Sequence, residues 1–245
     1  MNRILKDTLR KLLIFFHLDL TKNLRYDRLT KKIMKKNIKS TYNCIDIGCH
    51  KGEILDMMLQ YAPQGKHFAF EPIPYLFAEL ERDYKNRSFI FPYALSNKNG
   101  HSTFQFVKNA PAYSGIKKRR YDVANIEIEE IQVEVKMLDD VIPSNEKIDF
   151  IKIDVEGGEF DVIKGAKNTL KKNKPLVLFE CGLGASDYYD TNILNFYNFI
   201  TNEIGLKIFT LKSFLKNTPP LTLEEFENHF NSNTEYYFAA APYET

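Results

Sequence analysis

The sequence predicts an α/β fold with one seven-stranded, mostly parallel sheet and helices on both of its faces. Short, continuous apolar runs alternate with segments of helical periodicity along the 245-residue chain. This alternation is typical of parallel strands that are buried on both sides. A glycine-flanked turn follows the first run, and an acidic residue ends the second run about 25 residues later. Together these features place a ligand site at the carboxyl ends of the strands.

The predicted elements follow one another in a regular order. Seven strands are expected at 43–47, 66–71, 88–93, 148–154, 175–180, 206–211 and 235–240. Helices are expected at 53–61, 74–84, 159–171, 190–204 and 222–230. After the third strand, apolar and polar residues alternate at 101–107 and 126–135, which predicts a β-hairpin excursion with one solvated face. The polar, basic loop 108–125 joins these two strands, and a loop of this length is usually functional or disordered.

Charge divides the chain near residue 40. Residues 1–39 contain twelve Lys or Arg and three Asp, a net charge of +9, so the rest carries −7 of the total +2. We therefore predict a basic helical arm at 1–40 and a ligand-binding domain at 41–245. The apolar stretch of the arm is interrupted by His17 and Asp19, and it is shorter than the ~20 apolar residues that span a bilayer.

Three interpretations of the arm remain open. It packs its apolar face on the main domain, it lies on an anionic membrane surface, or it covers a site for a negatively charged substrate. Few aromatic residues accompany its Lys and Arg, so we expect no nucleic-acid partner. The three cysteines include no CxxC pair, which favours a reducing compartment. We expect a cytoplasmic protein, with the inner face of the membrane as an alternative setting, and make no prediction of oligomeric state.

The turn after the first strand indicates the kind of cofactor. Gly48 and Gly52 follow Asp46 in a D-x-G-x-x-x-G pattern, and Glu71 ends the next strand. A diphosphate cofactor such as NAD or FAD favours G-x-G-x-x-G, whose middle glycine is missing here. S-adenosylmethionine has a ribose and an adenine but no phosphate, and it suits this looser turn. A strand-end carboxylate such as Glu71 can accept hydrogen bonds from both ribose hydroxyls.

Four ordered motifs between about residues 43 and 181 resemble the FkbM-type class I methyltransferases, which have a Rossmann-like fold. Residues 44–52 look like the family's first motif, and Phe70-Glu71-Pro72-Ile73-Pro74 looks like its second. Ala94-Leu95-Ser96 with Gly100 is similar to the segment after the third strand. The run 148–159, with Lys152-Ile153-Asp154-Val155-Glu156-Gly157, is the most distinctive match. His50-Lys51 departs from the family, which more often has Asn and an apolar residue there.

The resemblance implies a cofactor site for S-adenosylmethionine. Asp46 would anchor the turn or the methionine ammonium group, Gly48 and Gly52 would allow close backbone approach, and Glu71 would hold the ribose. Ile73 and the backbone of Ala94 to Ser96 would flank the adenine. The full set that we expect to bind the cofactor is Asp46, Gly48, Cys49, Gly52, Glu71, Pro72, Ile73, Ala94, Leu95, Ser96 and Asp154.

Methyl transfer to a hydroxyl needs alignment and a proton acceptor. Asp154, Glu156 and Glu180 follow the fourth and fifth strands and are expected at the same sheet edge. His50, in the first turn, is the fourth catalytic candidate. Each has a structural alternative, such as a strand or helix cap. A divalent metal is compatible with several carboxylates and one histidine, but no ligand spacing requires one, so no metal ligand is assigned.

The resemblance implies an S-adenosylmethionine-dependent O-methyltransferase of EC class 2.1.1, acting on a hydroxyl of a sugar, surface glycan or secondary metabolite. The basic run 117–120 would suit an acidic or nucleotide-linked acceptor, although a solvated charge run is an equal alternative. Two other functions remain open. One is a nucleotide-dependent oxidoreductase or epimerase, which the absent G-x-G-x-x-G disfavours. The other is a non-catalytic subunit that retains the cofactor fold.

Overall fold

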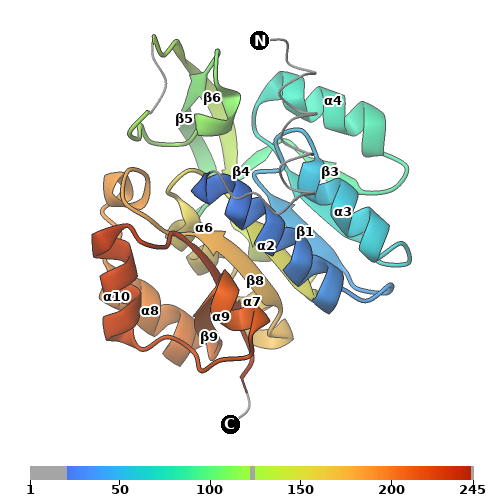
Figure 1. Ribbon diagram of the computed structural model, residues 1–245. Coiled ribbons are helices and arrows are strands. Elements are labelled where there is room, and N and C mark those ends of the chain that lie inside the picture. The colour runs from blue at the N-terminus through green and yellow to red at the C-terminus, as the bar shows by residue number, and fades with distance from the viewer. Residues whose placement is uncertain (1–20, 122–124, 244–245) are drawn as a thin grey trace.

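The computed structural model describes residues 21–121 and 125–243 and contains two sheets. The larger has seven strands in the order β3-β2-β1-β7-β8-β10-β9, and the smaller has three in the order β4-β6-β5. Figure 1 shows the smaller sheet beyond one end of the larger, with helices packed on the larger one. The predicted fold class, including the seven strands and the excursion, is confirmed.

The main sheet is parallel except for one strand. Its strands are β3 (Phe89–Phe91), β2 (His67–Phe70), β1 (Cys44–Ile47), β7 (Phe150–Ile153), β8 (Leu176–Glu180), β10 (Tyr237–Ala241) and β9 (Lys207–Thr210). Only β10 is antiparallel to its neighbours, β8 and β9. Because β1 lies between β2 and β7, the order reverses direction there, which is where α/β sheets bind ligands.

Alternation along β1 assigns the helices to the two faces. Cys44 packs with the helices α2 (Lys22–Asn37), α3 (Glu53–Tyr61) and α9 (Leu211–Leu215). Ile45 and Ile47 point to the other face and pack with residues of the remaining helices. These are α5 (Leu138–Val141), α6 (Glu159–Gly165), α7 (Lys167–Asn173), α8 (Ile193–Asn198) with the π-helical turn Phe199–Ile204, and α10 (Leu223–Ser232). The helix α4 (Pro74–Tyr84) packs beside α3 near β3.

Two predicted elements differ in detail. The helix expected at 159–171 is divided at Ala166 into α6 and α7. Gly165 explains the close packing at this break, since a Cβ there would lie 2.0 Å from the backbone oxygen of Ser96. The strand expected at 88–93 ends at Phe91, and β4 (Tyr93–Leu95) begins a different sheet after Pro92. Proline has no N–H to continue a ladder, so it favours this division.

The smaller sheet is more than a hairpin. β5 (Gly100–Val107) and β6 (Ile128–Lys136) pair antiparallel over their full length, as the period-two pattern predicts. β4 adds a third strand, parallel to β6. Because β4 directly follows β3, the smaller sheet is fixed close to the carboxyl ends of β1 and β2 (Figure 1).

Residues 22–37 of the predicted arm form α2, which packs on the main domain. Thr21 caps the helix by accepting a hydrogen bond from Leu24 N. Its buried side chains follow helical spacing and join the core beneath β1, β7 and β8: Tyr26, Leu29, Thr30, Ile33 and Met34. This packing matches the first of the three interpretations for that part of the arm. Residues 1–20, including His17 and Asp19, lie outside the described residues, and the division at residue 40 stays a prediction.

None of the helices that the structure describes is both long and apolar enough to cross a membrane.

Candidate functional site

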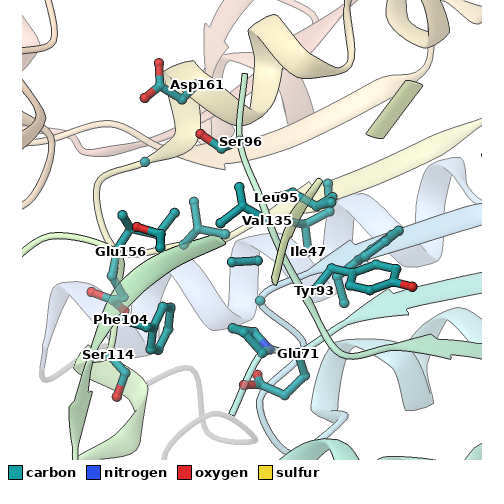
Figure 2. Close-up of a pocket in the computed structure, with 18 of the residues that line it drawn as sticks. Ile47, Glu71, Tyr93, Leu95, Ser96, Phe104, Ser114, Val135, Glu156 and Asp161 are labelled. Atoms are coloured by element: carbon teal, nitrogen blue, oxygen red, sulfur yellow. The ribbon is translucent and has the colours of Figure 1, made fainter. Parts of the chain in front are cut away.

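A pocket of about 350 Å³ lies between the carboxyl ends of β1, β2 and β7 and the smaller sheet. Its size is at the lower end of the roughly 300–1,000 Å³ typical of ligand sites. Ten predicted site residues line it: Gly48, His50, Glu71, Pro72, Ile73, Ala94, Leu95, Ser96, Asp154 and Glu156. In Figure 2, Glu156, Phe104 and Ser114 lie on one side of the view, with Ser96 and Asp161 at the top and Glu71 below.

The turn after β1 brings two strand ends into contact. Gly48 has a φ of 81°, and a Cβ at this position would lie 1.8 Å from the backbone oxygen of Asp154. Only glycine fits both the left-handed conformation and the close approach. The N–H groups of Gly48 and Cys49 both donate to the carbonyl of Phe70, at 3.1 and 3.0 Å. The turn is thereby tied to β2 as well as to β7.

Glu71 is buried in the pocket wall with both carboxylate oxygens oriented. Oε2 accepts a hydrogen bond from His50 N at 2.8 Å, and Oε1 accepts one from Ile73 N at 2.9 Å. Each oxygen keeps a further lone pair, so the group can accept two hydroxyls at once. Burial raises the pKa of Glu71 to about 7, against the effect of the two backbone N–H donors.

The other predicted residues of the first motif lie behind the pocket. Asp46, Cys49 and Gly52 do not line it. Asp46 is buried and interacts with the thiol of Cys49 and the backbone of Leu55. Burial raises the pKa of Asp46 to about 6, although the charge of Lys152 opposes the shift. In the described structure Asp46 thus contacts the turn and the start of α3, and its role toward a cofactor stays a prediction.

The apolar part of the pocket comes from β4 and from the start of α4. Ile73, Ala94 and Leu95 are buried and line the cavity. The backbone of Ser96 is fixed because its N–H donates to the carbonyl of Lys136 on β6 at 3.0 Å. These groups form a flat, apolar surface near Glu71, which suits an adenine next to a ribose.

Asp154, directly after β7, is held by two donors that the sequence analysis did not identify. Lys152 Nζ donates to Oδ2 at 2.9 Å and the hydroxyl of Tyr237 donates to the same atom at 2.7 Å. Burial opposes ionisation, yet the charge of Lys152 and these hydrogen bonds together lower the pKa of Asp154. Its side chain remains 34% exposed and lines the pocket. Asp154 is thus a persistent negative charge in the wall.

Glu180 does not line the pocket. It lies at the end of β8, which is the strand after β7 on the side away from β1, where the strand order reverses. Its partner in register on β10 is Tyr237. Burial first, and then the charges of Asp154 and Glu159, raise the pKa of Glu180 to about 8. The expectation that all three carboxylates emerge at one sheet edge is met, but only Asp154 and Glu156 reach the cavity.

Glu156 faces the pocket in an unusual backbone conformation. Its φ is 60°, a left-handed value that costs a non-glycine residue on the order of 1–3 kcal/mol and often marks a functional site. The carboxylate forms an ion pair with Arg119 of the loop that follows β5, and the two side chains are 15% and 13% exposed. The guanidinium of Arg119 also lies over the ring of Tyr113, 5.3 Å from its centroid.

A tyrosine from the distant part of the chain fixes the same loop. Tyr189 follows β8 and lines the pocket, and its hydroxyl accepts a hydrogen bond from Lys117 N at 2.9 Å. Arg120 N donates to the carbonyl of Gly184 at 2.9 Å. Glycine is required at 157 beside this ring, since a Cβ there would lie 2.6 Å from Ala185 O.

Glu159 follows the same turn, and its side chain stabilises the turn rather than lining the pocket. It is buried, and its Oε1 accepts hydrogen bonds from Val155 N and Gly157 N. Glu159 is thus not exposed to solvent. Within the described residues, 21–121 and 125–243, no group of three or more His, Cys, Asp or Glu could hold a metal ion.

Of the residues that reasoning from the sequence missed, Lys152 alone had a local signal. It lies two positions before Asp154 in the distinctive motif, on the same side of β7. Tyr237 is 83 residues away from Asp154 along the chain, so no spacing rule could connect them. From the sequence, Arg119 was considered only as part of the basic run 117–120. Its partner Glu156 belongs to a different part of the chain, so no local pattern connects the two residues.

Comparison with known proteins agrees with this geometry. The family described as "Methyltransferase FkbM domain" matches residues 46–203, more than half of the chain. The "2-O-methyltransferase NoeI" of Sinorhizobium fredii (strain NBRC 101917 / NGR234) is 31% identical over 144 residues, covering 53% of this chain and 59% of the relative. "Methyltransferase 1" of Beauveria bassiana (strain ARSEF 2860) is 27% identical over 141 residues, covering 49% and 57%. The matches therefore span somewhat more than half the length of these curated relatives.

The crystal structure of Methyltransferase FkbM from Methylobacillus flagellatus KT is similar in fold. It superposes with a TM-score of 0.51 at 16% identity, covering 82% of this chain and 44% of that one. The turn geometry, the strand order and the family match over residues 46–203 lead to one conclusion: this chain belongs to the FkbM methyltransferase family.

Proposed function

We propose that this protein is an S-adenosylmethionine-dependent O-methyltransferase that methylates a hydroxyl of a sugar, surface glycan or secondary metabolite. The observation that carries the proposal is Glu71, a buried carboxylate with two spare lone pairs beside a glycine turn that lacks a diphosphate cradle. The family match and a relative named as a 2-O-methyltransferase support the reaction class.

The residues present fit the cofactor. Glu71 would accept the two ribose hydroxyls, and Ile73 with the backbone of Ala94 to Ser96 would enclose the adenine. The ionised Asp154 would attract the positively charged methionine portion. The absence of a side chain at Gly48 lets the turn pack directly on the backbone of Asp154, and both residues line the pocket. When bound, S-adenosylmethionine supplies a methyl carbon activated by the adjacent sulfonium.

Asp154 and Glu156, the two catalytic carboxylate candidates that line the pocket, suit different tasks. Asp154 receives two hydrogen bonds on Oδ2 and has a lowered pKa, so it binds a proton weakly. We therefore assign Asp154 to charge stabilisation and orientation rather than to proton transfer. We assign acceptance of the proton from an acceptor hydroxyl to Glu156, which is paired with Arg119 of the loop after β5, or to His50, the other catalytic candidate that lines the pocket.

Calorimetry provides the first test. S-adenosylhomocysteine should bind with saturable heat, whereas NAD and UDP-sugars should not. Glu71→Ala should weaken the binding of S-adenosylhomocysteine by ~1.5–3 kcal/mol, the typical contribution of hydrogen bonds to a charged group. A protein that binds NAD and ignores S-adenosylhomocysteine would refute the proposed function.

Transfer of a labelled methyl group provides the second test. Glycans and polyols should become labelled, and Asp154→Asn should reduce turnover as well as cofactor affinity if Asp154 orients the cofactor. If Asp154→Asn loses turnover while its cofactor affinity is unchanged, Asp154 acts as the general base instead.

A further inference from the structure

Several charged side chains in and around the pocket are paired with one another. Arg119, from the loop after β5, forms an ion pair with Glu156, and both side chains are largely buried. Lys152 is bound to Asp154 in the floor of the site. Lys164 is paired with Asp161, which also accepts a hydrogen bond from Asn97 at 2.9 Å. A cation already neutralised in this way offers little to an anionic ligand.

The basic loop does not present a row of cations to the cavity. Lys117 lies 3.4 Å from Asp190, and both are exposed. Arg120 packs against Gly184, where a Cβ would lie 3.1 Å from the guanidinium carbon. Among the four basic residues at 117–120, only Lys117 lines the pocket. The sequence-based expectation that this run binds phosphate or carboxylate therefore has no support in the described structure.

The described lining contains more acidic than basic side chains. Two lysines, Lys98 and Lys117, line the cavity together with four acidic residues: Glu71, Asp154, Glu156 and Asp161. Both lysines are exposed, where water screens their charge. The cations beside Asp154 and Glu156 are already paired with these carboxylates, so an anionic acceptor would gain little attraction at this wall.

Glu156 is held in place for contact with a neutral hydroxyl. Its backbone is fixed in the left-handed region, with Gly157 packed against Ala185 and Tyr189. Arg119 fixes the carboxylate from the side and is itself seated on Tyr113. A carboxylate has about four acceptor positions, so one ion pair leaves others available to hydroxyl donors. Phe104 and Ile116 line the same region and provide apolar surface.

We propose that the acceptor is an uncharged, hydroxyl-bearing molecule such as a neutral sugar, recognised by Glu156, with Arg119 as the residue that positions Glu156. This inference rests on the proposed methyltransferase function and deepens it by naming the class of acceptor. It replaces the acidic or nucleotide-linked acceptor that the sequence suggested.

The first experiment compares two acceptor panels with the full chain and labelled S-adenosylmethionine. One panel contains methyl glycosides and neutral oligosaccharides, and the other contains uronates, sugar 1-phosphates and UDP-sugars. Neutral acceptors should give a kcat/KM at least about tenfold higher. Preference for the anionic panel would overturn the proposal, and so would failure to methylate either panel by a protein that binds S-adenosylhomocysteine.

The second experiment tests the role of Arg119. Arg119→Met should raise KM for the neutral acceptor about tenfold or more, and Arg119→Lys should recover part of the loss because it restores the charge. S-adenosylhomocysteine affinity should stay close to that of the parent, whereas the melting temperature should fall because Glu156 loses its partner in a largely buried ion pair. Arg82→Met is the matched control: Arg82 forms an exposed ion pair with Asp83 on α4, and its loss should leave KM unchanged.

The two proposals fail in different ways. Absence of S-adenosylhomocysteine binding would refute the methyltransferase function itself. Normal binding, combined with an unchanged acceptor KM in a folded Arg119→Met, would refute only the role of Arg119. Titration of the S-adenosylhomocysteine complex with inorganic phosphate and with glucuronate gives a direct check, because saturable binding of either at submillimolar concentration would contradict an acceptor site for neutral molecules.

Discussion

The buried carboxylate of Glu71 makes cofactor binding sensitive to pH near neutrality. Its pKa is raised to about 7 by burial, and only the ionised form can accept from both ribose hydroxyls while keeping its two backbone donors. With a pKa of about 7, the ionised share is about 90% at pH 8 and about 10% at pH 6. The affinity for S-adenosylhomocysteine should therefore fall about tenfold over this range, or about 1.4 kcal/mol.

The sign of the effect follows from the direction of the shift. A raised carboxyl pKa means that the group gains its charge late as pH rises, so binding improves with pH and levels off above about pH 8. Isothermal titration calorimetry at pH 6, 7 and 8 measures the change. Asp46, with a pKa raised to about 6, and Glu180, with one raised to about 8, titrate in the same range, so a variant is needed to isolate Glu71.

Glu71→Gln provides that control, because it keeps the shape of the side chain and removes the titration. The affinity of Glu71→Gln for S-adenosylhomocysteine should be low and nearly constant between pH 6 and 8. If the parent changes less than twofold over this range, or if Glu71→Gln keeps the full slope, the assignment of the ribose to Glu71 is wrong.

Three further predictions concern the turn, the pocket floor and the first described helix. Gly48→Ala places a Cβ 1.8 Å from Asp154 O at a φ of 81°, so urea denaturation should show a loss of several kcal/mol or no folding. Gly100→Ala, with open space around it, should cost only the backbone strain of about 1–2 kcal/mol; similar losses for both would contradict the close contact. Tyr237→Phe removes a donor to Asp154 and so raises the pKa of that carboxyl; carbon-13 NMR should show Asp154 titrating at higher pH in the variant than in the parent, and an unmoved titration would show that the hydroxyl of Tyr237 does not stabilise the ionised form. Ile33→Ala should lower the free energy of unfolding by about 2–5 kcal/mol because Ile33 is fully buried, whereas Leu194→Ala, 44% exposed, should cost little; equal losses would show that α2 is not part of the core.

The last of these predictions bears on the predicted arm. From charge alone, residues 1–39 look separable, and their removal would be expected to leave a folded domain. The structure places five buried side chains of α2 in the core, and Arg25 forms an ion pair with Glu235 near the end of the chain. We therefore expect a truncation at residue 39 to be markedly destabilised. The net charge of a segment reflects the exposed face of its helix, whereas the buried residues on the other face determine where the helix packs.

Local patterns were enough for the cofactor half of the site. The turn at Gly48 and the strand end at Glu71 belong to one strand–helix–strand unit, whose spacing fixes their relative positions. Parallel strands also place Asp154 at the same edge. Glu180 shows the limit of this rule: it ends the adjacent strand β8, but the pocket lies over β1, β2 and β7, one strand away.

The acceptor half depended on contacts that no local pattern encodes. Arg119 and Glu156 are joined through a loop, and Tyr237 reaches Asp154 because β10 is inserted antiparallel beside β8. The basic run 117–120 was visible, but its interpretation required knowing that carboxylates already pair with Lys117 and Arg119. Pairing of charges is a tertiary property, and composition alone does not determine it.

Pro92 separates β3 from β4 and so lets both sheets contribute to the pocket. The seven-stranded sheet ends at Gly48, Glu71 and Asp154, whereas the smaller sheet supplies Ala94 and Leu95 from β4 and Phe104 from β5. If the proposed function holds, substitutions in the connection after β5 would change the acceptor and leave the contacts of Glu71 and β4 with adenosine intact. A transplant of residues 100–136 between relatives would be the natural unit for exchanging their specificities.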